Sequence, residues 1–206
     1  MRSLLLCLGF AAVAAAQTGP GGWRSMFDGK TLDGWRETPF ARHGAVKVED
    51  GALILEPGGP MTGVTRTGDA PKSRYEVRFE AKRVRGGDFF ASVTFPVGDS
   101  YCTFVTGGWG GDIVGLSSIN GWDASENETR AYFEFEAGRW YAFRLEVTPE
   151  RIRVWIDGQP VTDANIAGRT IGLRPGDTKL CIPFGFMSYN TAGAIRKIEY
   201  RELPRP

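Results

Sequence analysis

The feature that most constrains the fold is a strict alternation of apolar and polar residues over short segments. Tyr75, Val77 and Phe79 alternate with charged residues, and residues 143–147 and 151–156 follow the same pattern. Because successive side chains of a strand point to opposite faces, each segment predicts a strand with one face in the core. No window carries a sustained apolar stripe of helical period.

Turn residues recur throughout the chain, which contains 28 Gly and 12 Pro. Asp50-Gly51 separates residues 46–48 from residues 52–55, and Asp157-Gly158 follows residues 151–156, so both pairs predict hairpins. Two more strands are expected over residues 180–189 and 195–203. Turns at intervals of roughly 8–12 residues are typical of an antiparallel sandwich. The sequence therefore predicts an all-β fold without a helix longer than about two turns.

The N-terminus predicts an export signal. Arg2 precedes an uncharged apolar run over residues 4–16, in which Ala14 and Ala16 offer the small side chains that signal peptidase requires. This run is too short to span a bilayer of ~30 Å. We expect a signal peptide over residues 1–16 and one domain over residues 17–206. The mature protein is expected to be secreted or periplasmic, monomeric and without a membrane span.

Charge and cysteine content exclude several classes of partner. Lys and Arg total 25 against 24 Asp and Glu, so no basic field favours nucleic acid, and a single His excludes a multi-His zinc site. Cys7 would leave with the signal peptide. Cys102 and Cys181 lie in apolar, strand-like segments, where buried free thiols are common. We expect them to be unpaired, although an exported protein could also pair them.

A particular order of segments resembles a known family. Residues 26–35 read MFDGKTLDGW and resemble the LFDGKSLDGW opening of the 3-keto-disaccharide hydrolase domain family. Residues 48–53 and 75–82 are similar to the family's first hairpin and following strand, and weaker similarity extends to residue 203. The resemblance implies a concanavalin-like jelly-roll β-sandwich of two antiparallel sheets, with the ligand on the concave face. It also implies hydrolysis of 3-keto-glycosides or disaccharides.

The chain departs from this family at two motifs. Asp88 stands near the position of the Asn in the family's NSGI motif, and Cys102 stands where its YE.QI strand carries Glu. Tyr101 begins that strand, whose other face would carry Cys102 and Phe104. Two alternatives to a hydrolase or lyase therefore stay open: a carbohydrate-binding module without turnover, and a laminin-G-like interaction domain.

Residues 109–130 have the composition of a sugar site, with two Trp, four Gly and four carboxylates. Indole rings stack on the apolar face of a pyranose, polar side chains bond its hydroxyls, and glycines let the backbone approach closely. The alternative is a Gly-rich hairpin whose Trp rings plug the edge of the core. The candidate substrate-binding residues are Trp109, Trp122, Asp88, Tyr101, Asn127, Arg130 and His43.

Carboxylates are the expected acid/base groups. The 3-keto group acidifies the neighbouring C–H, so one base could start an elimination that water then completes. The candidates are Asp112, Asp123, Glu126 and Glu128, as bases or as oxygen ligands of a divalent cation such as calcium. Solvated loop carboxylates are the alternative. His43 could also act as the base, or be a surface histidine without a role.

Overall fold

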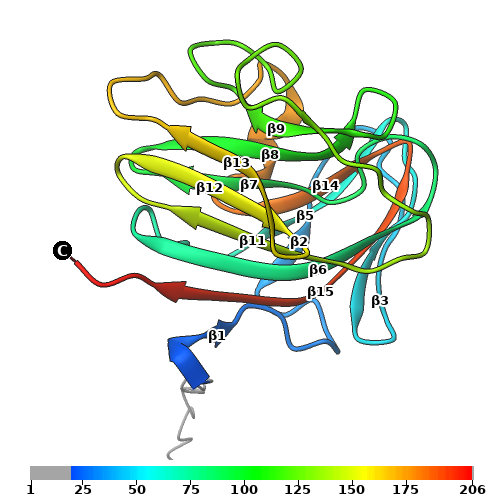
Figure 1. Ribbon diagram of the computed structural model, residues 1–206. Coiled ribbons are helices and arrows are strands. Elements are labelled where there is room, and N and C mark those ends of the chain that lie inside the picture. The colour runs from blue at the N-terminus through cyan, green and yellow to red at the C-terminus, as the bar shows by residue number, and fades with distance from the viewer. Residues whose placement is uncertain (1–19, 206) are drawn as a thin grey trace, which may run out of the picture.

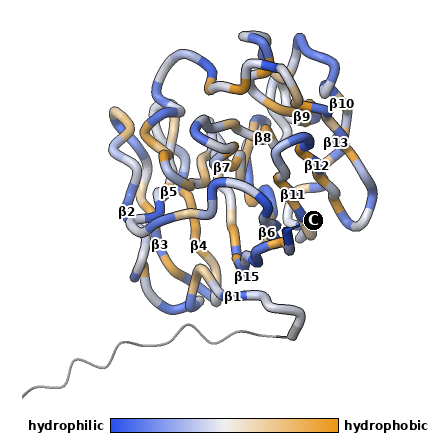
Figure 2. The backbone as a smooth tube through the Cα atoms, turned by 90° about the vertical axis from the view of Figure 1, so that its left-hand side faces the viewer, coloured by the Kyte–Doolittle hydropathy of each residue, from blue (hydrophilic) through white to orange (hydrophobic). Residues whose placement is uncertain are grey.

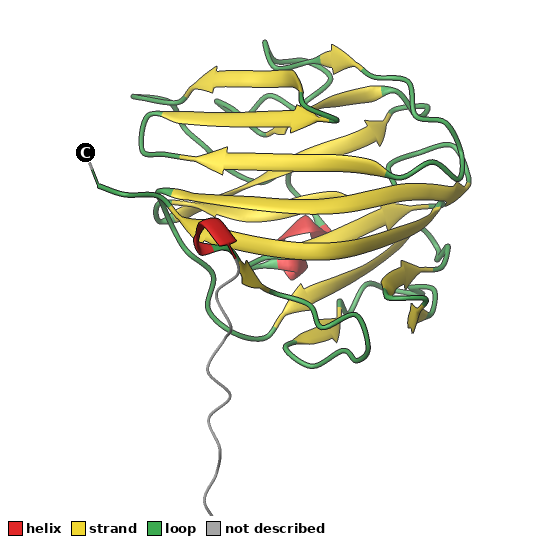
Figure 3. Ribbon diagram, turned by 60° about the horizontal axis from the view of Figure 1, so that its bottom comes forward, coloured by secondary structure: helices red, strands yellow, loops and turns green. Residues whose placement is uncertain are grey.

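The computed structural model describes residues 20–205 as two packed antiparallel sheets (Figure 1). Nearly all regular structure is strand, with two short helical turns, η1 (Pro20–Gly22) and η2 (Asp177–Cys181) (Figure 3). The predicted all-β jelly roll of two antiparallel sheets is confirmed. Within residues 20–205, no helix is long and apolar enough to cross a membrane. The predicted signal peptide lies outside the described residues.

Sheet A has eight strands in the order β13-β12-β11-β6-β15-β4-β3, with β1 paired to β15. Its strands are β1 (Arg24–Ser25), β3 (Val46–Glu49), β4 (Ala52–Leu55), β6 (Tyr75–Arg85), β11 (Tyr141–Val147), β12 (Arg151–Ile156), β13 (Gln159–Asn165) and β15 (Ala192–Glu202). Both Asp-Gly hairpins form as predicted, β3–β4 around Asp50-Gly51 and β12–β13 around Asp157-Gly158.

Sheet B has seven strands in the order β10-β9-β8-β7-β14-β5-β2. Its strands are β2 (Trp35–Glu37), β5 (Met61–Arg66), β7 (Ser92–Val97), β8 (Ser100–Gly108), β9 (Ile113–Ser117), β10 (Ala131–Tyr132) and β14 (Gly185–Tyr189). The strand predicted over residues 180–189 was wrong in its first half, because η2 extends to Cys181 and β14 begins only at Gly185. Pro183 lies between them and has no N–H to donate to a ladder.

The core lies between the inward faces of the two sheets, and hydrophobic and hydrophilic residues alternate along several strands (Figure 2). Phe79 of sheet A stacks on Phe143, with ring centroids 4.9 Å apart, and meets the edge of Phe186 from sheet B at the same distance. Trp35 and Phe184 also contact the Phe186 ring. This aromatic cluster joins the sheets and fixes how they face each other.

Both described cysteines are free and buried, as predicted. The Cys102 side chain points into the core between the sheets, whereas Cys181, the last residue of η2, packs on the outer face of sheet B with Phe40 and Met187. Burial raises the pKa of each thiol to about 12. Burial therefore disfavours the thiolate form of both side chains near neutral pH.

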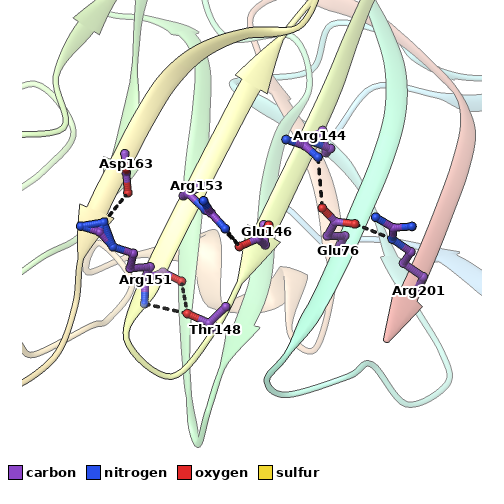
Figure 4. A network of polar contacts seen from close by, with 8 residues as sticks. All are labelled: Glu76, Arg144, Glu146, Thr148, Arg151, Arg153, Asp163 and Arg201. Carbon is purple, nitrogen blue, oxygen red and sulfur yellow. Dashed lines mark hydrogen bonds and ion pairs between the residues drawn. The ribbon is translucent and has the colours of Figure 1, made fainter. Parts of the chain in front are cut away.

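The outer face of sheet A is covered by charged residues that pair with one another (Figure 4). Glu76, with only 2% of its side chain exposed, accepts hydrogen bonds from Arg144 on one side and Arg201 on the other, at 3.3 and 2.5 Å. On the neighbouring strands, Glu146 pairs with Arg153. These charges therefore satisfy one another across the strands on the outer face of sheet A.

Candidate functional site

A cleft of about 360 Å³ opens on the outer face of sheet B. Its floor is formed by outward-facing side chains of β5, β7, β8, β9 and β14, and its rim by the β6–β7 loop, the β8–β9 turn and the segment at η2. The floor residues are Met61, Ser92, Thr103, Val105, Ser117, Met187 and Tyr189, and the rim residues are Asp88, Phe89, Trp109, Arg174, Pro175, Asp177 and Thr178.

Strand register explains how residues distant in sequence form one floor. Met187 lies opposite Ser92 on β7, and Thr103 lies opposite Ser117 on β9, so these side chains share one face. The intervening residues, such as Phe104, point into the core. The floor thus consists of hydroxyl and apolar groups and carries no formal charge.

A small apolar cluster covers the part of sheet B beside the cleft. Phe40 packs there with Cys181 and Met187. Beneath them, Thr38 and Thr65 exchange a hydrogen bond of 2.7 Å, and Thr65 also donates to the Leu180 carbonyl at 3.1 Å. The outer face is therefore closed towards β2 and open towards the β8–β9 turn.

Trp109 stands at the open end of the cleft with 41% of its surface exposed. The Arg174 guanidinium lies 5.9 Å from the centroid of its ring. The rings of two other lining residues, Phe89 and Tyr189, have centroids 5.6 Å apart. The site thus offers an exposed aromatic face near a hydroxyl-lined floor.

The Arg174 guanidinium, at the Trp109 end of the cleft, is held by a chain of contacts. Arg174 forms an ion pair of 3.1 Å with Asp123, whose side chain is only 14% exposed. Ser117, a floor residue, donates a hydrogen bond to the other oxygen of Asp123. With both oxygens engaged, Asp123 serves to orient Ser117 and Arg174 towards the cleft.

Two further carboxylates line the rim directly. Asp88 is half-buried in the β6–β7 loop and accepts a hydrogen bond of 2.7 Å from the Phe89 amide. Asp177 is exposed at the first position of η2. These are the two carboxylates that line the cleft, and each could accept a proton or bond a sugar hydroxyl.

The structure brings together only some of the residues that the sequence singled out. Trp109 and Asp88 line the cleft, and Asp123 acts beside it. Trp122 does not line the cleft; it lies in the β9–β10 loop with 59% of its surface exposed, so it is not a core plug either. Tyr101 is half-buried on β8 and also stands outside the lining.

The remaining candidates have other local partners. Asn127 donates to the carbonyls of Leu116 and Trp122, at 2.7 and 3.0 Å, and so shapes the β9–β10 loop. Asp112 and Glu126 are exposed in loops, and Glu128 forms an ion pair with Arg169. Arg130 donates a hydrogen bond to the Ser125 carbonyl. The His43 ring lies within 2.9 Å of the Gly44 carbonyl oxygen.

Sequence reasoning missed Arg174, Asp177 and the aromatic pair Phe89 and Tyr189. Arg174 and Asp177 lie in a segment without regular alternation, so no pattern indicated their direction. Cys102, which stands where the family carries Glu, faces the core, while its neighbour Thr103 faces the cleft.

The donor set does not fit a resident cation. Within residues 20–205, no three side chains of His, Cys, Asp or Glu gather closely enough to hold a metal ion. The four loop carboxylates expected as ligands are spread over the β8–β9 turn and the β9–β10 loop. We therefore derive no step through a metal.

The two-sheet jelly roll is also the fold of solved carbohydrate-active proteins, including a glucanase. One solved structure with this fold is SCLam, an endo-β-1,3(4)-glucanase of family GH16, with a TM-score of 0.60 and 11% identity over 91% of this chain and 94% of that chain. The Crh5 transglycosylase in complex with NAG has a TM-score of 0.57 and 13% identity over 87% of this chain and 84% of that chain. The carbohydrate-binding module CBM66 from Bacillus subtilis has a TM-score of 0.56 and 10% identity over 82% of this chain and 96% of that chain. Identities this low establish the fold alone.

The sequence itself identifies the family. Residues 22–198 match the 3-keto-alpha-glucoside-1,2-lyase-like domain, so the chain belongs to this family, as the opening decapeptide had indicated. No curated protein is similar enough in sequence to count as a relative. The chain thus belongs to a carbohydrate-active, hydrolase-like domain family.

Proposed function

We propose that the cleft on sheet B binds a saccharide of one or two rings, and that this binding is the primary function of the domain. The observation that carries the proposal is an uncharged floor of hydroxyl and apolar side chains beneath an exposed indole, Trp109. A pyranose presents one apolar C–H face and a rim of hydroxyls, which such a cleft complements. A volume of about 360 Å³ is within the range of small-molecule sites.

The polar groups have defined places in this proposal. Ser92, Thr103 and Ser117 present hydroxyls from the floor, and Arg174 and Asp88 bond sugar hydroxyls from the rim. A titration of the purified protein with α-glucosides and their 3-keto forms, followed by calorimetry, tests it. Saturable 1:1 binding supports the proposal, and no heat at millimolar sugar contradicts it.

Turnover of 3-keto-glycosides is a second candidate function, favoured by family membership and by two carboxylates on the cleft rim. In the lyase reaction, a base removes the proton from the carbon beside the keto group, and the glycosidic oxygen at the next carbon leaves with its bonding electrons. The leaving oxygen takes up a proton, and water then adds to the resulting enone. Asp177, exposed beside the cleft, is our candidate base.

If this candidate is right, Asp177→Asn is expected to abolish release of the leaving group from a 3-keto-glucoside, since general-base catalysis contributes roughly 10²–10⁴-fold. Binding of the unoxidised glucoside should stay within a factor of about three. The matched control is Asp112→Asn, an exposed carboxylate outside the cleft. Turnover that survives Asp177→Asn, or none by the wild type, rules out this role.

We further propose that the protein is exported and that residues 17–206 form the mature, monomeric domain. The apolar run over residues 4–16 and the small residues Ala14 and Ala16 support this proposal. Mass spectrometry of protein recovered from the cell exterior or periplasm is expected to show an N-terminus at Gln17 or within a few residues of it. Recovered protein that retains residues 4–16 would refute the signal.

A further inference from the structure

Arg83 is an anomaly in the core. It continues the inward-facing row of β6 after Phe79 and Ala81, yet it is charged, and only 8% of its surface is exposed. It forms no ion pair among residues 20–205, and its Nε has no hydrogen-bond partner there. Burial lowers the pKa of the guanidinium, while the charge of Asp88 opposes this shift. A buried cation without a close counter-ion is unfavourable, so a compensating role is expected.

The contacts of the guanidinium point to the turn that carries Trp109. Nη2 donates to the carbonyl of Gly111, and Nη1 donates to that of Phe135 at 3.5 Å. The rings of Phe90 and Phe135 flank the charge, with centroids 5.3 and 5.8 Å from Cζ. The Arg83 guanidinium is thereby held between two aromatic rings, and it donates directly to the β8–β9 turn at Gly111.

This turn adopts a conformation that needs support. Gly107, Gly110 and Gly111 have φ of +79°, +103° and +113°, and Trp109 itself has φ of +49°. A bulky side chain rarely occupies the left-handed region unless the surroundings enforce it. A Cβ on Gly107 would lie 2.6 Å from Arg83 Nη2, so glycine at this position is what allows the guanidinium to reach the turn.

The same turn also packs against the β6–β7 loop, the neighbouring segment of the cleft rim. A Cβ on Gly111 would lie 3.0 Å from the Gly87 carbonyl oxygen, and a Cβ on Gly108 would lie 4.0 Å from Asp88 Oδ1. Gly87 and Asp88 belong to the loop that forms the adjoining rim. Arg83 therefore lies beneath the junction of the two rim segments that carry Trp109 and Asp88.

We propose that Arg83 is a positioning residue: its buried guanidinium holds the β8–β9 turn so that the Trp109 ring stays aligned with the cleft for a saccharide. The proposal rests on the proposed function for its binding consequence, but the alignment of the ring can be measured separately. Arg83 touches no ligand and acts through Gly111.

Arg83→Met, which keeps the apolar stem and removes the charge and donors, is the test. The Trp109 indole N–H signal, assigned by its loss in Trp109→Phe, is expected to shift and broaden in ¹⁵N–¹H NMR spectra. The signals of Trp122 and Trp155 should stay in place. Affinity for the glucoside that the wild type binds should fall about tenfold or more, measured at a temperature where the variant is fully folded. Arg78→Met, on the opposite face of β6, is the matched control and should leave both readouts unchanged.

An unchanged Trp109 signal in folded Arg83→Met, or affinity within about twofold of wild type, would overturn the proposal. If Arg83→Met does not fold, Arg83→Lys decides, because it keeps the stem and the charge but replaces the planar fork that donates to the Gly111 and Phe135 carbonyls, and it should give the same shift and loss of affinity. If the wild type binds no saccharide, the proposed function fails, and the indole signal alone still decides whether Arg83 positions the ring.

Discussion

Replacing Trp109 with alanine is expected to weaken saccharide binding ten- to a hundredfold while leaving the thermal transition almost unchanged. The ring is 41% exposed at the cleft rim, so its removal opens no cavity in the core. A sugar that covers an indole face gains hydrophobic and stacking energy on the order of 1–3 kcal/mol, which corresponds to that change in affinity. Calorimetric titration and a melting curve on the same preparation measure both quantities.

Trp122→Ala is the matched control for this prediction. Trp122 is also an exposed indole, at 59%, but it lies in the β9–β10 loop outside the cleft lining. Its removal should leave affinity within about twofold. Equal losses in the two variants, or a loss only in Trp122→Ala, would move the binding surface from the cleft to the β9–β10 loop.

Replacing Phe186 with alanine is expected to lower the free energy of unfolding by ~3–5 kcal/mol, the usual effect of removing a buried aromatic ring. Phe186 is fully buried and contacts Phe79 of the opposite sheet at 4.9 Å between centroids, as well as Trp35 and Phe184. The cavity would lie where the two sheets meet. Urea unfolding followed by fluorescence measures the change.

Phe89→Ala provides the comparison, since this half-buried ring lines the cleft instead of the core. It should destabilise the protein much less and weaken saccharide binding instead. A loss below about 1 kcal/mol for Phe186→Ala would mean that the aromatic cluster does not hold the sheets together.

Much of the fold could be predicted because its physical cause is local. Alternation across residues 75–82 and 151–156 requires one buried face per strand, and Asp-Gly pairs specify tight hairpins. The pairing of β6 with β15 could not be read in this way, because those strands are distant in sequence and their register depends on the packed core. Residues 180–182 looked like a strand because they are apolar, but Leu180 and Cys181 end η2, and Cys181 packs with Phe40 and Met187 on the outer face of sheet B.

The site was harder to predict, because a cleft is assembled from single outward-facing positions on several strands. The density of Trp, Gly and carboxylate drew attention to the β8–β9 turn, where Trp109 lines the cleft. The same density also selected Trp122, whose side chain does not line the cleft, although its neighbour Asp123 contacts two cleft residues. Arg174 and Asp177 come from a segment more than 60 residues later, and only the tertiary fold brings them to Trp109.

The most direct test of the central claim is a crystal structure of the protein soaked with a glucose disaccharide or its 3-keto form. Electron density for a sugar ring against Trp109, with hydroxyls bonded to Thr103, Ser117 or Arg174, is the predicted result. Density only against Trp122 or on the outer face of sheet A, with the cleft left free of sugar, would contradict it.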